Sequence, residues 1–153
     1  KWSDMFRGVT PLSLDSKGRF AVPAKYHEVL KSSCDNRLVI TVDSPKCLLL
    51  YPQPVWEPIE KRLLTGLSSF NPKIRAMQRL LVGNACDVAM DGAGRLLIVA
   101  QLRQFVGLTK DVVLVGQGEK FELWDAEKWN QEIEAALEFK DGDMPPELEG
   151  FSL

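Results

Sequence analysis

The chain has 153 residues, enough for one large domain or two small ones, and its 45% hydrophobic and 26% charged content is ordinary for a soluble globular protein. No apolar run approaches the roughly 18 residues of a membrane span, and the N-terminal residues lack the apolar core of a signal peptide. The net charge of −2 conceals an asymmetry, because residues 1–103 hold 15 Lys and Arg against 9 Asp and Glu, whereas residues 104–153 hold 4 against 12. A basic region suits a polyanion and an acidic end repels one.

Short strands and turns dominate the first third of the chain. Apolar runs predict strands over 10–14, 20–22, 38–42 and 47–51, with a short helix over 24–32. Turns are expected over 15–19 and 43–46, because Asp, Ser, Gly and Pro favour tight backbone. The stretch 5–8 is typical of a native start, so we expect residues 1–4 to precede the native chain.

Helices are expected between and after the strand-rich segments. Residues 54–67 carry one apolar stripe at spacings of 3, 4 and 4, and Asn71-Pro72 predicts the start of a helix that stops near Gly83. Strands follow over 85–90, 96–99, 112–115 and 121–124, with a short helix to about 106. Asp125 is expected to cap a last helix, and the tail from Asp141 is predicted to be disordered or loosely docked.

The chain contains an internal repeat. Residues 14–22, Leu-Asp-Ser-Lys-Gly-Arg-Phe-Ala-Val, return as residues 90–98, Met-Asp-Gly-Ala-Gly-Arg-Leu-Leu-Ile, at an offset of 76 positions. The match continues downstream at an offset of 73, for example from Trp56 to Trp129, which places a length change near 33–36. One small β-rich unit has therefore been duplicated, and the function of the turn is expected at two positions in the chain.

Two units of this size are too small to bury much surface separately, and their short strands need partners at the open edges. We therefore expect an α+β fold, mainly β, in which the two units interlock about a pseudo-two-fold axis. The predicted segments are 9–55 for the first unit, 56–84 for a helical connector, 85–128 for the second unit, and 129–153 for a C-terminal helix and acidic tail.

Cysteine and histidine usage argues against a metal centre. Cys34, Cys47 and Cys86 are odd in number and widely spaced, and His27 is the single histidine of the sequence. We expect reduced thiols in a cytoplasmic protein, with no metal ion and no cofactor.

The repeated turns and several other stretches resemble the MraZ family of bacterial transcriptional regulators. The turn motifs are Asp15-Ser16-Lys17-Gly18-Arg19, followed by Phe20-Ala21-Val22-Pro23, and Asp91-Gly92-Ala93-Gly94-Arg95-Leu96-Leu97-Ile98. Supporting stretches are Met5-Phe6-Arg7-Gly8, Cys47-Leu48-Leu49-Leu50-Tyr51-Pro52, Gln78-Arg79-Leu80-Leu81 and Phe121-Glu122-Leu123-Trp124. The resemblance covers the chain from Met5 to about Trp129.

This resemblance implies two tandem SpoVT-AbrB-like units, each a swapped hairpin, that form a pseudo-two-fold β-barrel flanked by helices. It also implies a cytoplasmic, nucleoid-associated protein that binds double-stranded DNA at repeated short G-rich promoter boxes. MraZ-like proteins repress their own division and cell-wall gene cluster and form ring-shaped homo-oligomers, so both properties are expected, with no membrane partner.

The chemistry of the turns supports a DNA-binding site independently of the resemblance. Arginine can hold guanine O6 and N7 together or grip a phosphate, and Gly18 allows close approach of the backbone to a groove. The aspartates repel phosphate, so we interpret them as turn-formers that hold the nearby Arg or bond backbone amides. The candidate DNA-binding residues are Arg19, Lys17, Asp15, Arg95, Asp91, Arg7 and Lys25. Three cations on the middle helix have three alternative interpretations, as DNA contacts, as a solvated helix face or as a subunit contact: Lys73, Arg75 and Arg79.

Two other classes of function stay open. An oligomeric assembly module without DNA binding would use Trp56, Trp129 and Tyr51 as interface anchors, although core packing is the simpler interpretation. A swapped-barrel enzyme is disfavoured by the single histidine and by the lack of a nucleophile elbow or a complete glycine-rich dinucleotide motif.

Overall fold

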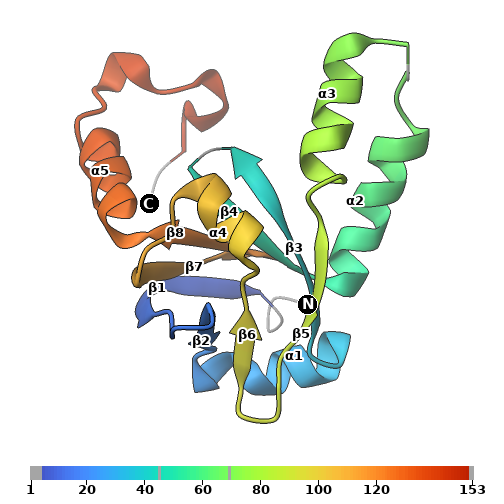
Figure 1. Ribbon diagram of the computed structural model, residues 1–153. Helices are drawn as coiled ribbons and strands as arrows, with labels where there is room; N and C mark the ends of the chain where they lie inside the picture. The colour runs from blue at the N-terminus through green and yellow to red at the C-terminus, as the bar shows by residue number, and fades with distance from the viewer. Residues whose placement is uncertain (1–4, 45, 69, 152–153) are drawn as a thin grey trace.

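The structure is a computed structural model that describes residues 5–44, 46–68 and 70–151. Helices α2 and α3 extend away from the sheets as an arm, and α5 lies on the opposite side of the molecule (Figure 1). The strands are β1 (Phe6–Ser13), β2 (Arg19–Ala21), β3 (Arg37–Ser44), β4 (Cys47–Pro52), β5 (Cys86–Ala89), β6 (Arg95–Leu97), β7 (Asp111–Gly118) and β8 (Phe121–Asp125). The helices are α1 (His27–Cys34), α2 (Gln53–Thr65), α3 (Pro72–Leu81), α4 (Ala100–Val106) and α5 (Ala126–Leu137), with 3₁₀ turns at Ala24–Tyr26, Asp141–Asp143 and Pro146–Leu148.

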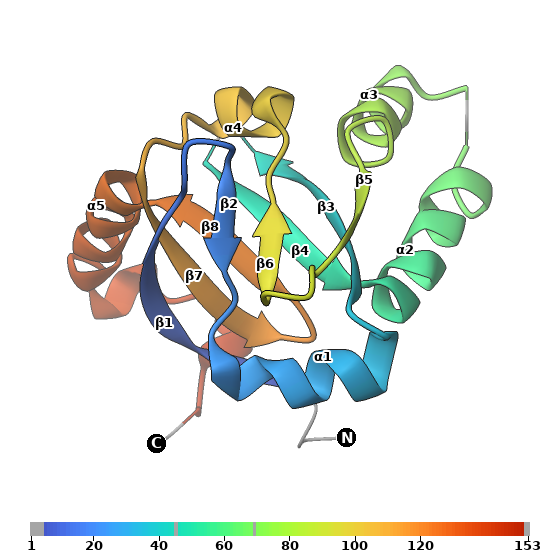
Figure 2. The ribbon, with the colours of Figure 1, turned by 60° about the horizontal axis from the view of Figure 1, so that its bottom comes forward.

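The two copies of the repeat interlock. In the described residues a six-stranded sheet has the order β1-β7-β8-β4-β3-β5, so β1 of the first copy pairs with β7 of the second, and β5 of the second pairs with β3 of the first. A separate ribbon forms from β2 and β6, one strand from each copy, and lies across the large sheet (Figure 2). The prediction of a mainly β fold with two interlocked units is confirmed. The pairings among the described residues do not include one between β1 and β5 that would close the large sheet.

Residues from both copies form one core. On the ribbon, Phe20 and Leu96 face each other in register and are buried, and they belong to the same cluster as Leu50 and Leu123 of the large sheet. Each such side chain stabilises the fold by about 1.5–3 kcal/mol through burial. Because the cluster draws on both copies, neither copy holds a complete core of its own.

Repeated aromatic pairs hold the flanking helices to the sheet. Trp56 of α2 lies 5.4 Å from Tyr51 between ring centroids, and Trp129 of α5 lies 5.7 Å from Trp124. Trp56 is 3% exposed, so the core interpretation of this side chain is confirmed over the interface interpretation. The same pairing at both helices follows from the repeat.

Side-chain caps explain the starts of α3 and α5. The Asn71 carboxamide accepts a hydrogen bond from the Lys73 backbone N–H at 2.9 Å, and the Asp125 carboxylate accepts one from that of Lys128 at 3.4 Å, so both predicted caps are confirmed. Helix α3 ends at Leu81 with Val82 as its C-cap, in agreement with the prediction of an end at about Leu81 or Val82 and a stop at Gly83. Strand β1 is longer than predicted, because pairing with β7 runs from Phe6 onward and an edge strand tolerates Pro11.

The turn predicted over 43–46 lies partly outside the described residues, at Pro45, and the assignment of residues 1–4 lies wholly outside them. Within the described residues, every helix is too short or too polar to cross a bilayer. The tail contains two 3₁₀ turns, and residues 142–151 are exposed. The division into four segments stays a prediction.

Candidate nucleic-acid interface

An aspartate carboxylate closes the first repeated turn, Asp15–Arg19, which we call the first loop. One carboxylate oxygen of Asp15 accepts hydrogen bonds from the backbone N–H groups of Lys17 and Arg19, both at 2.9 Å, and the other accepts from the Arg19 Nε at 2.8 Å. The Gly18 N–H donates to the Asp15 carbonyl at 3.0 Å. These bonds agree with the interpretation of Asp15 as a turn-former.

The second loop, Asp91–Arg95, repeats this pattern with a looser ion pair. The Asp91 carboxylate accepts from the backbone N–H groups of Ala93 and Arg95, both at 2.9 Å, but its contact with the Arg95 Nε is 3.3 Å long. Arg95 is also more exposed than Arg19, with side-chain exposures of 38% and 27%. The second loop therefore holds its arginine less firmly.

Both loop aspartates are ionised at neutral pH. The backbone N–H of Arg19, and then its guanidinium, lower the pKa of Asp15 from 3.8 to about 2. The backbone N–H of Arg95 is the largest cause that lowers the pKa of Asp91. Each carboxylate thus orients its arginine through Nε, and the terminal guanidinium nitrogens of Arg19 and Arg95 have no protein partner within the described residues.

The register of the ribbon brings the two arginines onto one surface. Arg19 pairs with Leu97, and Arg95 pairs with Ala21, so the arginines are diagonal neighbours, with Cα atoms about 7–8 Å apart. Successive strand residues alternate between faces, and the buried Phe20 lies opposite this set. The outer face of the ribbon therefore presents both arginines, with their loops at its two ends (Figure 2).

Each loop is braced by the other copy. The Ile98 N–H donates to the Gly18 carbonyl at 2.9 Å, and the Arg103 Nε donates to the Ile98 carbonyl at 3.0 Å. Gly18 has a φ of +87°, and a Cβ placed there would lie 2.7 Å from the Arg103 Nε. Glycine is required here by conformation and by the close approach of Arg103.

His27 is the counterpart of Arg103 at the second loop. Its Nε2 lies 2.8 Å from the Val22 carbonyl, and a Cβ at Gly94 would lie 2.8 Å from its Cε1. Sequence reasoning missed both bracing residues as loop contacts. The offset of 76 that aligns the loops also aligns His27 with Arg103, so the repeat itself contains the signal.

The other candidates are not all near the loops. Arg7 and Lys25 come together through Tyr26, whose hydroxyl donates to the Arg7 carbonyl at 2.7 Å and whose ring centroid lies 5.0 Å from the Lys25 Nζ. Strand β1 separates Arg7 from the first loop by about 20 Å, at about 3.3 Å per residue. Lys17 is exposed at the tip of the first loop. The exposed cations of the middle helix lie on α3, within the projecting arm (Figure 1): Lys73, Arg75 and Arg79.

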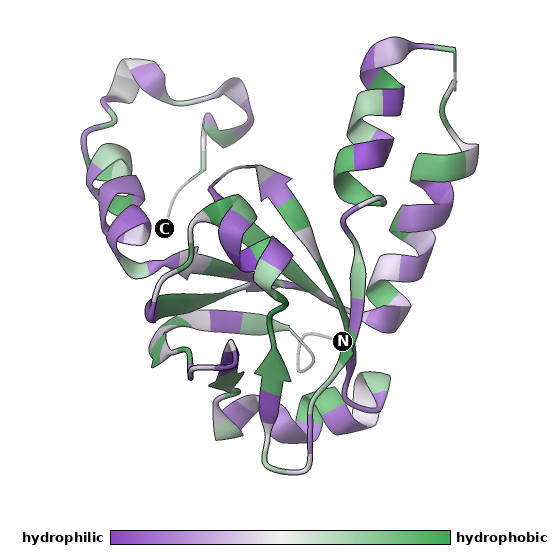
Figure 3. Cartoon of the chain, viewed as in Figure 1, coloured by the Kyte–Doolittle hydropathy of each residue, from purple (hydrophilic) through white to green (hydrophobic). Residues whose placement is uncertain are grey.

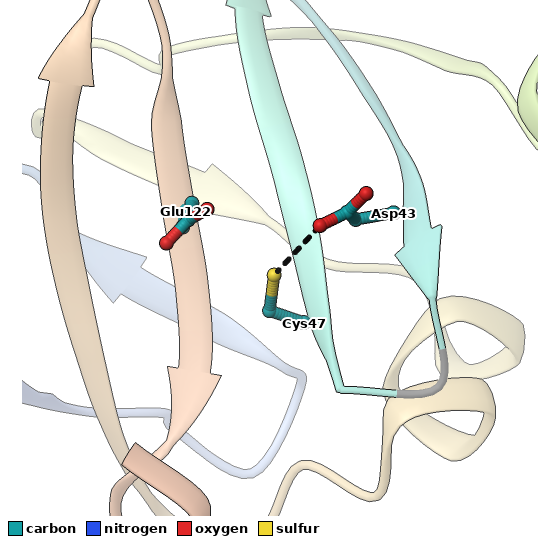
Figure 4. A group of neighbouring side chains, drawn as sticks. All are labelled: Asp43, Cys47 and Glu122. Atoms are coloured by element: carbon teal, nitrogen blue, oxygen red, sulfur yellow. Dashed lines mark hydrogen bonds between the residues drawn. The ribbon is translucent and has the colours of Figure 1, made fainter. Parts of the chain in front are cut away.

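A separate cluster joins Asp43, Cys47 and Glu122, whose side chains come from β3, β4 and β8 (Figure 4). The Cys47 Sγ lies 3.9 Å from the Asp43 carboxylate, and burial followed by the negative charge of Glu122 raises the pKa of the thiol to about 12. The thiol therefore stays protonated and donates a hydrogen bond to the Asp43 carboxylate. The Trp124 indole N–H donates to Glu122 at 3.0 Å, so this cluster is internally satisfied.

Comparison with known proteins identifies the family. The family model described as "MraZ protein, putative antitoxin-like" matches residues 5–80 and again residues 81–143. A Nitrosomonas eutropha protein named "Transcriptional regulator MraZ" is 67% identical over 149 residues, which cover 97% of this chain and 100% of that protein. Proteins with the same name from Nitrosomonas europaea and Yersinia pestis are 64% and 50% identical, again over 97% of this chain and 100% of theirs. The chain belongs to the MraZ family.

Proposed function

We propose that this chain is a sequence-specific DNA-binding transcriptional regulator that lays the β2–β6 ribbon on double-stranded DNA. In this proposal it represses its own division and cell-wall gene cluster by binding repeated G-rich promoter boxes. The observation that carries the proposal is the presence of two aspartate-held arginines on one outer face. The similar proteins named as transcriptional regulators add independent support.

The geometry of the ribbon is suited to one short box. Arg19 and Arg95 are diagonal neighbours about 7–8 Å apart. That separation corresponds to roughly two steps of about 3.4 Å along a DNA strand. Each arginine is already oriented by its aspartate, so less side-chain freedom is lost when it meets a guanine edge.

Several chains acting together would strengthen a weak individual contact. A ring-shaped homo-oligomer bound to several boxes gains affinity through effective concentration. In this proposal the protein is cytoplasmic and associated with the nucleoid. The α2–α3 arm supports self-association, because it carries exposed apolar side chains between hydrophilic ones (Figure 3). These are Leu64, Leu67, Phe70 and Met77.

The same arm favours a second candidate function, an assembly module that does not bind DNA. Phe70 is 90% exposed, and exposed apolar groups of this kind mark contact surfaces. This alternative predicts oligomers without salt-dependent DNA affinity. The proposed regulator is expected to form oligomers and to bind DNA in a salt-dependent way.

Binding to a labelled duplex with three G-rich repeats, against a scrambled duplex of equal composition, tests the proposal. Wild type is expected to prefer the repeat duplex, and Arg19→Ala is expected to lose that preference. Lys31→Ala is the matched control, because Lys31 is an exposed cation on α1 whose ammonium group already pairs with Asp35. Equal binding of wild type to both duplexes, or binding to neither, would refute sequence-specific recognition.

A further inference from the structure

A hollow of about 510 Å³ opens beside the first loop, and its lining includes Leu14 and Leu108 as well as polar residues. The first copy contributes Asp15 and Ser16 to its lining, and the second copy contributes Arg103, Thr109 and Lys110. Two cations and a loop hydroxyl thus meet at a site formed only when the copies interlock. The Asp15 carboxylate is already engaged by Arg19 and by the backbone N–H groups of the turn.

Arg103 is held in place without using all of its donors. The guanidinium is half-buried against Gly18, and Nε is bonded to the Ile98 carbonyl at 3.0 Å. Its terminal nitrogens have no partner among the described residues. The backbone of Lys110 is also fixed, because its carbonyl accepts from the Leu14 N–H at 2.8 Å. An oriented guanidinium with free N–H donors next to a lysine is suited to one phosphate group.

Among the described residues, the second loop is not flanked by a matching pair of cations. His27 takes the position of Arg103, and Asn36 takes that of Lys110, because the Asn36 carbonyl accepts from the Met90 N–H at 2.9 Å. The next cation, Arg37, lines a different hollow together with Asp87. The difference between the loops therefore extends beyond Lys17 and Ala93.

We propose that the hollow formed by Ser16, Arg103 and Lys110 is a seat for one backbone phosphate of the DNA that Arg19 contacts. Arg103 and Lys110 neutralise the phosphate, and the Ser16 hydroxyl donates to one of its oxygens. Since a phosphate contact carries no base information, the seat fixes the position of the first loop while Arg19 reads the box. This inference rests on the proposed function.

The salt dependence of binding to a single-box duplex tests the seat. Each neutralised phosphate contributes about 0.9 to the slope of log K against log salt concentration. Because Arg103 and Lys110 share one phosphate, Arg103→Gln is expected to lower the slope by at most about 0.9, on the box and scrambled duplexes alike. Arg37→Gln is the matched control, because Arg37 is an exposed cation that lines a different hollow, and it should leave the slope unchanged. An unchanged slope in Arg103→Gln, or an equal loss in Arg37→Gln, would overturn the seat.

Lys110→Gln guards against misfolding, because Lys110 is exposed and Arg103 also braces the loop. It should lower the slope in the same way while the thermal midpoint is unchanged. A series of duplexes, each with one phosphate replaced by a neutral methylphosphonate, locates the contact. At one position the replacement should weaken binding of the wild type but not of Arg103→Gln. If every position weakens both proteins equally, the seat is excluded. The proposed function fails separately, when wild type shows no preference for the box and Arg19→Ala changes nothing.

Discussion

The Asp15 carboxylate orders the first loop only while it is ionised. Its pKa is lowered from 3.8 to about 2, chiefly by the Arg19 backbone N–H. A lowered pKa means that the carboxylate's contribution is fully present above pH 3.8 and is lost as the pH falls through about 2. A carboxyl-carbon NMR titration should show Asp15 with a midpoint near 2, and a midpoint at 3.8 would contradict the hydrogen-bonded turn.

The cysteines should differ sharply in reactivity. Burial raises the pKa of the Cys47 thiol to about 12, and the residue is 1% exposed, whereas Cys86 is half-buried as the first residue of the edge strand β5. Only the thiolate is a nucleophile, so Cys86 should react first with iodoacetamide at neutral pH. Peptide mass spectrometry over time measures the order, and unfolding in denaturant should bring all three cysteines to similar rates. Equal native rates for Cys47 and Cys86 would contradict this.

Replacing each loop arginine should have unequal effects. Arg19→Ala removes the arginine that shares its loop with Lys17 and has the shorter contact with its aspartate, and this loop lies next to Arg103. A guanine contact of this kind is worth about 1–3 kcal/mol, and Arg95→Ala is expected at the lower end of that range. Fluorescence anisotropy titrations on one duplex compare the two variants. A greater loss from Arg95→Ala would reverse the assigned importance of the loops.

At the scale of elements, the glycine before Arg19 decides whether the loop can form. Gly18 has a φ of +87°, and a Cβ there would lie 2.8 Å from the Ile98 carbonyl oxygen, which is backbone and cannot swing away. Gly18→Ala should therefore lower the free energy of unfolding by more than about 1 kcal/mol. Gly92→Ala is the control, because a Cβ at Gly92 meets no atom within 4 Å, and its effect should be below about 0.5 kcal/mol. Chemical denaturation measures both, and equal effects would contradict this explanation.

Local signals predicted the helices better than the strands. Asn71 and Asp125 cap their helices as expected, because a cap depends on residues only two or three positions away. The start of β1 was missed because Gly8 and Pro11 obscure the alternation, and only the distant partner β7 shows that this segment is a strand. Sheet pairing also brings Glu122 close to Asp43 and Cys47, and no local sequence pattern predicts that cluster.

For the whole molecule, the repeat predicted the interlocked arrangement, but not which strands join the copies. The central contact is between β4 and β8, with Leu48 opposite Leu123, and no local pattern distinguishes this pairing from others. The loops show the same limit. Both aspartate–arginine pairs were readable from spacing, whereas the braces by His27 and Arg103 depend on contacts between the copies. Features that lie within one copy of the repeat were therefore predictable, whereas the strand partners and side-chain contacts between the copies were not.

The interlocked topology predicts that the two copies fold together or not at all. Strand β5 pairs with β3, and β1 pairs with β7, so separating residues 5–84 from 85–151 leaves each half without a partner strand from the other copy. It also divides the shared core, separating Phe20 from Leu96. The free energy contributed by the burial that is lost exceeds the typical free energy of unfolding of a small domain, about 5–15 kcal/mol.

Each fragment alone should therefore give the narrow amide spectrum of an unfolded monomer by NMR, and mixing the two should restore the dispersed spectrum of the intact chain. The intact chain should unfold in one transition, with coincident tryptophan fluorescence and circular dichroism. A folded, monomeric fragment 5–84 would show that the first copy holds its own core. Because the braced loops depend on both copies, the same result would also remove the structural basis for coupling Arg103 to the first loop.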